Sequence, residues 1–325
     1  STTYPKKAYR LKTLKSDYKT KDKVRFFANW KKHNKFNLKA YYTDGLISRD
    51  PVNAAIGTDI WATQKGVHND LIREDSFGFI NGFPCILIIN NEFQGVYSFN
   101  LPRPDFDYTK YAIMGGEYNE QSQFKKAGVK LDGSDFETLN PDDEPNDDER
   151  KAVDDLINFV ATTSDEDFKA HLAEHINLNS AIDYFIFSNL IDNGDAWGKN
   201  QVILSWDGKI WYWQPYDLDA TWAGEYNGSV KNLATDINGK QHMLFDRISK
   251  LYLEEIKSRY NSLRSWLTPG YVLSKFRNRI NEIGVDNFDR EHAKWNNPAK
   301  DTEDYKQITE AVYHQFQLLD GRWLN

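Results

Sequence analysis

The sequence predicts an α+β fold of two lobes, the first rich in strands and the second mainly helical. Over residues 1–110 the apolar residues mostly alternate with polar ones, which is typical of strands, and one early stretch is helical. Over 111–325 the apolar spacing is mostly helical and is interrupted by one β-hairpin. The chain of 325 residues also holds 19 Phe, 18 Tyr and 10 Trp, enough apolar surface for a sizeable core. We therefore expect a site in the cleft between a lobe over 1–110 and a lobe over 111–325.

The expected elements of the first lobe are strands joined by turns, with one helix. Asp50-Pro51 marks the helix start, because proline is favoured in the first helical turn. Asn90-Asn91 marks a hairpin turn between two apolar runs. The predicted elements are three strands within 1–42, a helix over 50–61, and strands over 77–80 and 84–99.

The expected elements of the second lobe are amphipathic or buried helices around a hairpin. Ser164, with Asp167 three residues later, is a helix N-cap pattern. Asp207-Gly208 predicts the turn of a hairpin. The predicted elements are helices over 149–160, from 164 onward, and over 178–190, 251–266, 272–283 and 304–319, with hairpin strands over 201–205 and 209–214.

The charge of the chain is unevenly distributed. The formal net charge is -7, yet residues 1–50 hold 14 Lys and Arg against four Asp. Residues 132–155 hold 11 Asp and Glu against two basic residues, which is typical of an exposed loop entering a helix. The basic start is typical either of a solvated strand surface or of a phosphate-contacting one. Cys85 is the one cysteine, which excludes an intramolecular disulfide framework and a cysteine-rich zinc site.

Several function classes lack their sequence signals. No apolar run approaches the roughly 18 residues of a membrane span, and Ser1 to Arg10 contains no signal-peptide core, which leaves localisation open between bacterial cytoplasm, cell surface and virion. The chain has no G-x-x-x-x-G-K loop, so a P-loop nucleotidase is excluded. The seven His show no H-E-x-x-H pattern, which disfavours a zinc enzyme. Nothing indicates sequence readout of nucleic acid.

Three polar residues around the hairpin form the most informative constellation. Asp195 lies five positions before Asn200, and Asp217 follows at the far end of the hairpin. Protein-kinase catalytic lobes have this order of Asp, Asn, hairpin and Asp. Phosphoryl transfer needs a carboxylate to orient the attacking hydroxyl and hard oxygen ligands for Mg²⁺. The spacing alone is weakly specific, because Asp and Asn in loops are usually turn formers.

Five ordered segments resemble the CotH kinase family, an atypical protein-kinase family named for a bacterial spore-coat protein. Together they cover about residues 4–224, and each is weak alone. Versions such as Y-P-K-K, L-K-A-Y-Y and F-N-L-P look most like phage and prophage members. The segments are Y-P-K-K-A-Y-R-L-K from Tyr4, K-F-N-L-K-A-Y-Y-T-D-G-L-I-S-R-D from Lys35, I-I-N-N-E-F-Q-G-V-Y from Ile88, Asn193 with Asp195 and Asn200, and P-Y-D-L-D from Pro215.

The resemblance implies a two-lobed, atypical protein-kinase-like fold that transfers the γ-phosphate of ATP to Ser or Thr of a protein with Mg²⁺ or Mn²⁺. It implies that Asp195 is the catalytic-loop acid and that Asn200 and Asp217 are metal ligands. Asp219 is implied either as a second metal ligand or as a structural cap. Lys199 is expected either to neutralise phosphate charge or to be a solvated surface lysine.

The resemblance also gives candidates for the nucleotide-binding lysine. Lys39 precedes the first helix and Asp59 lies on it, a separation similar to that of the kinase strand lysine and its helix acid. Lys39 is therefore expected at the α- and β-phosphates with Asp59 as its partner, and Lys7 is the competing candidate. Arg49 matches the family's helix-entry arginine, with a structural and a phosphate-facing role both open.

The chain departs from the family pattern at two positions. Asn100 stands where an acidic residue usually follows the hairpin, and Asp50 replaces the asparagine of an R-N pair. The family's small-residue loop is expected just before Ser1. These departures leave open a non-catalytic module of a phage tail, baseplate or cell-surface assembly, with an assembly partner instead of a protein substrate. Adenylyl transfer stays open, as does a sugar-active protein in which D-L-D mimics a D-x-D metal motif.

Overall fold

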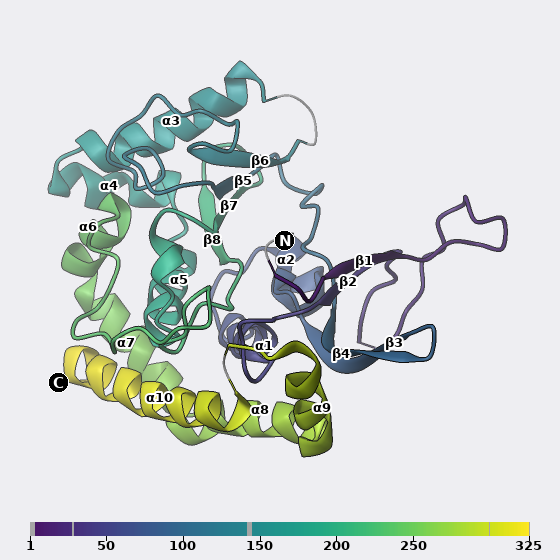
Figure 1. The fold of residues 1–325 in the computed structure, drawn as a ribbon. Coiled ribbons are helices and arrows are strands. Elements are labelled where there is room, and N and C mark those ends of the chain that lie inside the picture. Colours follow the sequence, from purple (N-terminus) through teal and green to yellow (C-terminus); the bar gives the residue numbers. More distant parts are fainter. Residues whose placement is uncertain (1–3, 28, 142–144, 299, 325) are drawn as a thin grey trace.

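The structure of the chain is a computed structural model that describes residues 4–27, 29–141, 145–298 and 300–324. Within these ranges the fold is α+β, with ten α-helices and two antiparallel four-stranded sheets. The two sheets lie in different parts of the molecule, and α1 lies between them (Figure 1). The two-lobed α+β fold predicted from the sequence is confirmed.

Three groups of strands alternate with three groups of helices along the described residues. The strands are β1 (Tyr9–Lys12), β2 (Lys35–Lys39), β3 (Gly82–Ile89), β4 (Glu92–Asn100), β5 (Tyr111–Gly115), β6 (Phe136–Asn140), β7 (Gln201–Ser205) and β8 (Trp211–Pro215). The α-helices are α1 (Arg49–Trp61), α2 (Asn69–Arg73), α3 (Asp147–Thr162), α4 (Asp165–His175), α5 (Leu178–Leu190), α6 (Met243–Leu251), α7 (Leu253–Arg264), α8 (Pro269–Ile283), α9 (Val285–Trp295) and α10 (Asp301–Trp323). Two short 3-10 helices are η1 (Asp75–Gly78) and η2 (Gly194–Trp197).

The first sheet has the strand order β1-β2-β4-β3. Its register pairs Lys39 with Ser98 and Leu38 with Phe99. Paired residues in an antiparallel sheet share a face, so Lys39 and Ser98 lie on one face and Leu38 and Phe99 on the other. The second of these faces is aromatic, and Trp30 is buried in the cluster that covers it. The first face therefore carries the polar side chains toward the rest of the molecule.

The second sheet has the order β6-β5-β7-β8 and rests on the buried helix α5. Ser180 of α5 exchanges two hydrogen bonds with the main chain of Trp213 on β8, which fixes the helix against the hairpin. The predicted hairpin and the predicted helix over 178–190 are confirmed. The sequence analysis did not predict β5 and β6, which extend this hairpin to a full sheet.

Other local predictions need correction. The predicted strand over 77–80 is wrong, because Asp75–Gly78 forms η1 with Phe77 in the left-handed region. The middle strand predicted within 1–42 is reduced to a single bridge between Val24 and His33. The structure also contains α2, which the sequence analysis did not predict, and Tyr252 separates α6 from α7 within the helix predicted over 251–266.

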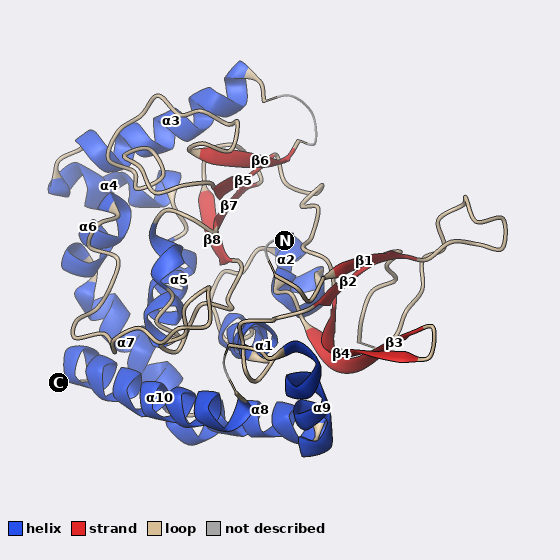
Figure 2. Cartoon of the chain, viewed as in Figure 1, coloured by secondary structure: helices blue, strands red, loops and turns tan. Residues whose placement is uncertain are grey.

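The C-terminal helices return to the first sheet. Helix α8 contacts β3 and α9 contacts β4, while α10 runs beside α5, α7 and α8 (Figure 2). Elements of the predicted second lobe therefore pack on strands of the first, and the boundary at residue 110 stays a prediction. Among the described residues, no helix combines the length and the apolar content needed to cross a bilayer.

Candidate active site

The segment after β8 forms a tight loop, Asp217 to Trp222, at the end of the second sheet. Asp217 has a φ of 54°, in the left-handed region that Asp adopts more readily than most residues. The Trp222 main-chain N–H donates to Ile191 O at 2.9 Å, which ties the loop to the end of α5. The side chains of Asp217 and Asp219 are partly buried and have no hydrogen-bond partner among the described residues.

The first two turns of α1 hold this loop from the other side. Asp50 Oδ1 accepts the main-chain N–H of Leu218 at 3.3 Å. Asn53 Nδ2 donates to Leu218 O at 2.9 Å and to Thr221 Oγ1 at 2.8 Å. Asn53 Oδ1 in turn accepts the Trp222 indole N–H at 2.8 Å. The position of Asp217 and Asp219 is therefore set by side chains of a helix about 165 residues earlier in the chain.

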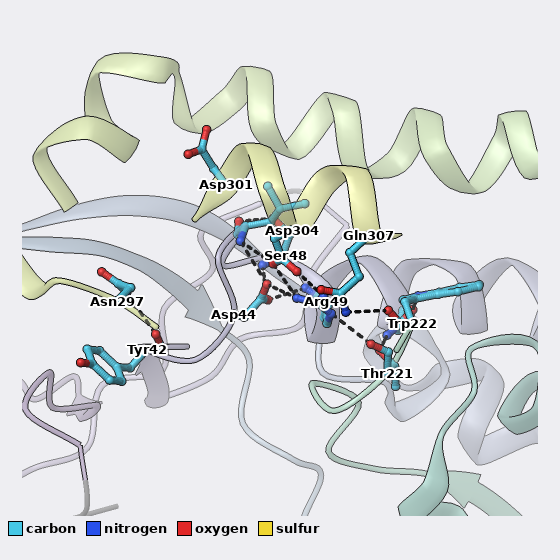
Figure 3. Close-up of polar contacts among 12 residues, drawn as sticks. Tyr42, Asp44, Ser48, Arg49, Thr221, Trp222, Asn297, Asp301, Asp304 and Gln307 are labelled. Atoms are coloured by element: carbon cyan, nitrogen blue, oxygen red, sulfur yellow. Dashed lines mark hydrogen bonds and ion pairs between the residues drawn. The ribbon is translucent and has the colours of Figure 1, made fainter. Parts of the chain in front are cut away.

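Arg49, also at the start of α1, is buried in an ion-pair cluster (Figure 3). Its Nη1 lies 2.9 Å from Asp44 Oδ1 and 2.6 Å from Asp304 Oδ2, and its Nη2 pairs with Asp304 Oδ1. Its Nε donates to Thr221 O at 3.0 Å. These four contacts of the guanidinium are all with protein atoms, so the structural role left open for Arg49 is the one that the geometry supports.

Asp195 lies in η2, the short helix that precedes β7. Asn193 caps this helix, because its Oδ1 accepts the Asp195 main-chain N–H at 3.1 Å. The Tyr118 hydroxyl lies 2.9 Å from Asp195 Oδ1 and 2.8 Å from Gly194 O, and it donates toward both. The carboxylate of Asp195 is thus oriented by a tyrosine while its second oxygen stays available.

Asn200 occupies the residue just before β7. Its φ is 56°, and its main-chain N–H donates to Gly115 O at 3.2 Å. Although the residue is buried, its side-chain amide has no hydrogen-bond partner among the described residues. Asn adopts the left-handed region more readily than a branched residue, so the backbone at Asn200 takes this conformation at a low cost in free energy.

Lys39 is a partly buried lysine whose charge acts on the carboxylates of this site. Burial lowers the pKa of Lys39, but Asp50 and then Asp217 raise it more, so the net pKa lies above the usual value. Lys39 has no hydrogen-bond or ion-pair partner of its own within the described ranges. Its ammonium therefore stays charged and free to bind an anion.

The two loop carboxylates have raised pKa values. Burial and the charge of Asp50 raise the pKa of Asp217, the charge of Asp195 raises it further, and Lys39 opposes them. Burial and the charges of Asp217 and Asp50 raise the pKa of Asp219. Four carboxylates, Asp50, Asp195, Asp217 and Asp219, thus share one region with two lysines, Lys39 and Lys199, which leaves a surplus of negative charge.

The structure separates the other predicted residues from this group. Asp59 pairs with Lys275 at 2.8 Å and accepts the Tyr271 hydroxyl, both on α8, so it is not brought to Lys39. Lys7 is exposed and donates to Tyr4 O at 2.6 Å. Lys199 Nζ lies 3.8 Å from Glu117 Oε1, and the charge of Lys199 lowers the pKa of Asp217.

The sequence analysis did not predict three residues that help to position the groups of the site. Asn53 follows Arg49 by one helical turn, so its position on the loop-facing side could have been inferred from helix periodicity. Asp50 was noted as part of a helix start and as a departure from a pattern, but not as a residue of the site. Tyr118 lies in a loop without a motif, and no signal in the sequence indicates its contact with Asp195.

A family model described as CotH kinase protein matches residues 1–317. The chain belongs to this CotH kinase family. Membership indicates a kinase-like, transferase function for the CotH chain and agrees with the grouping of Asp195, Asp217 and Lys39. A search of curated proteins found no match.

Kinase-like CotH chemistry implies ATP and a divalent metal, and the residues present fit both. Mg²⁺ usually takes only one or two carboxylates from a protein and the rest of its ligands from phosphates and water. Asp217, Asp219 and the amide of Asn200 offer hard oxygens that accept no hydrogen bond from any residue that the structure describes. The surplus negative charge around them favours a bound dication. Within the described ranges, no three His, Cys, Asp or Glu side chains are close enough to form a metal site without such additional ligands.

Proposed function

We propose that this CotH-family chain transfers the γ-phosphate of ATP to the hydroxyl of a Ser or Thr in a protein, using Mg²⁺ or Mn²⁺. The observation that carries the proposal is the electrostatic grouping of Lys39, Asp195 and Asp217 in one region. Asp50 and Asp217 raise the pKa of Lys39, and Asp195 raises the pKa of Asp217. Such mutual shifts are typical of functional sites.

Asp195 is the group that orients the acceptor hydroxyl. Its Oδ1 is held by Tyr118, and its other oxygen accepts the hydroxyl proton. The hydroxyl oxygen forms a bond to the γ-phosphorus while the bond from that phosphorus to the β,γ-bridging oxygen breaks. ADP leaves, and the products are ADP and the phosphorylated side chain.

Lys39, Asn200, Asp217 and Asp219 hold the nucleotide and its metal. The Lys39 ammonium pairs with the phosphates nearest the nucleoside, and the oxygens of Asn200, Asp217 and Asp219 hold the metal. When bound there, the metal would supply positive charge that neutralises the charge developing on the transferred group. Lys199, which follows η2 in the sequence, is a second cation for the negative charge on the transferred phosphoryl group. Lys7 and Asp59 have no role in this assignment.

The motif versions from Tyr4, Lys35 and Phe99 support a finer proposal, that the chain is a phage- or prophage-type CotH member. On this proposal the protein substrate, or the assembly partner of a non-catalytic module, belongs to a virion or to a bacterial surface. The lobes over 1–110 and 111–325 are proposed to enclose the site.

The test is transfer of radiolabel from γ-labelled and α-labelled ATP to the chain itself and to acidic and basic generic proteins. We expect γ-label transfer by the wild type and a loss of about 10²–10⁴-fold in Asp195→Asn, with ATP affinity retained. Transfer of α-label would refute phosphoryl transfer in favour of adenylylation. Binding of ATP without transfer of either label would favour the non-catalytic module.

A further inference from the structure

A buried chain of hydrogen bonds joins β4 to the loop that carries Asp217 and Asp219. Asn100 Nδ2 donates to the Tyr41 hydroxyl at 2.9 Å, and that hydroxyl donates to Asp50 Oδ2. Asp50 Oδ1 accepts the Leu218 main-chain N–H at 3.3 Å. Asn100 is 0% exposed and Asp50 is 2% exposed, so water does not replace these contacts.

The direction of the chain is fixed at its β4 end. Arg279 Nη2 donates to Ser98 Oγ at 2.6 Å, and Ser98 Oγ donates to Asn100 Oδ1. Because the amide oxygen is used, Asn100 presents its NH₂ group to Tyr41. The Tyr41 hydroxyl must then donate onward, and Asp50 is the acceptor. An ionised carboxylate can accept from both the hydroxyl and the Leu218 N–H, because it is an acceptor only.

The carboxylate at the end of this hydrogen-bond chain acts by its charge on the candidate phosphate-binding lysine, Lys39. Lys39 is two residues before Tyr41, on the sheet face that Ser98 and Asn100 share. The charge of Asp50 is the strongest of those that keep Lys39 protonated. Asp50 thus contacts the Asp217–Asp219 loop through Leu218 and acts on Lys39 by charge.

Asn100 and Asp50 contact the same hydroxyl, that of Tyr41. Exchanging these two residues would keep one carboxylate and one amide on that hydroxyl. The Tyr41 hydroxyl can donate to whichever neighbour is the carboxylate, so the exchange needs only a reversed direction of hydrogen bonding.

We propose that Asp50 is a positioning residue of the nucleotide site, supplying through the Asn100–Tyr41–Asp50–Leu218 chain the one carboxylate that holds Lys39 and the metal-binding loop in place. The proposal rests on the proposed function, because the groups that Asp50 positions are those assigned to ATP and its metal. It adds that this hydrogen-bond chain needs a single carboxylate, which can stand at position 50 or at position 100.

The experiment measures the affinity for Mg²⁺-ATP by calorimetry and the melting temperature of four proteins: wild type, Asp50→Asn, Asn100→Asp and the exchanged double variant. We expect Asp50→Asn to weaken Mg²⁺-ATP binding at least tenfold. Asn100→Asp should lower the melting temperature, because it places two buried carboxylates on one hydroxyl. The double variant should recover Mg²⁺-ATP affinity to within about threefold of the wild type, since one carboxylate is restored beside Lys39.

Asp320→Asn is the matched control. Asp320 Oδ1 also accepts a tyrosine hydroxyl, that of Tyr260 at 2.8 Å, but between α7 and α10. Its affinity for Mg²⁺-ATP should equal that of the wild type. Equal affinity in Asp50→Asn and wild type would overturn the inference, as would a folded double variant that binds as weakly as Asp50→Asn. Absence of Mg²⁺-ATP binding by the wild type would instead overturn the proposed function.

Discussion

Replacement of Arg49 by methionine should destabilise the fold strongly, because the arginine pairs with two buried carboxylates. Asp44 and Asp304 pair with Arg49, and all three side chains are at most 4% exposed. Methionine keeps most of the volume but leaves both acids uncompensated. Removing one partner of a buried ion pair costs about 3–5 kcal/mol, and the lost hydrogen bond to Thr221 O adds to the loss.

The assay is equilibrium urea denaturation of wild type, Arg49→Met and Arg150→Met. Arg150 pairs with Asp147 at 2.9 Å at the surface, where an ion pair contributes about 0.2–1 kcal/mol. The same chemical change should therefore have a several-fold larger effect at Arg49. A loss below about 1 kcal/mol in Arg49→Met would refute the reasoning that this cluster ties α1, α10 and the Asp217 loop together.

Three further predictions concern other buried or site-adjacent groups. Burial lowers the pKa of His242 to about 3, so the unfolded chain takes up the proton first as the pH falls below about 6.5. From pH 7.5 to 5.0 the wild type should therefore lose about 2 kcal/mol more unfolding free energy than His242→Leu, as measured by urea denaturation at both values. Lys6→Met should cost about 3–5 kcal/mol by leaving Glu291 unpaired in the interior, and Lys6→Met with Glu291→Gln should recover part of this in the same assay; strictly additive losses would contradict the pairing. Tyr118→Phe should lower kcat for γ-phosphate transfer about five- to tenfold with an unchanged KM for ATP, and a change confined to KM would contradict its contact with Asp195.

The sequence predicted the fold best where periodicity and turn chemistry agree. The buried helix over 178–190 and the hairpin at Asn90-Asn91 follow from local signals, and both Asn residues have a positive φ. Strands β5 and β6 are only five residues long; β5 pairs with the distant strand β7, and β6 pairs with β5. Such pairing is decided by tertiary contacts that a local pattern does not contain.

The candidate site was predictable in its chemistry but not in its connections. The spacing of Asp195, Asn200 and Asp217 indicated which loops carry oxygen ligands. The partner expected for Lys39 was Asp59, on the analogy of kinase spacing. In the structure Asp59 instead pairs with Lys275 of α8, and the charge of Asp50 acts on Lys39. Spacing along a helix fixes the face of a side chain, not the element that packs on this face.

The most direct test of a metal-dependent nucleotide site is the calorimetric affinity for ATP of wild type and Asp217→Asn, each measured with Mg²⁺ and with EDTA. The account predicts that the wild type binds ATP at least tenfold more tightly with Mg²⁺ than with EDTA, and that Asp217→Asn loses this difference while it keeps the metal-free affinity. A wild type that binds ATP equally with and without metal, or an Asp217→Asn variant that keeps the full metal dependence, would contradict it.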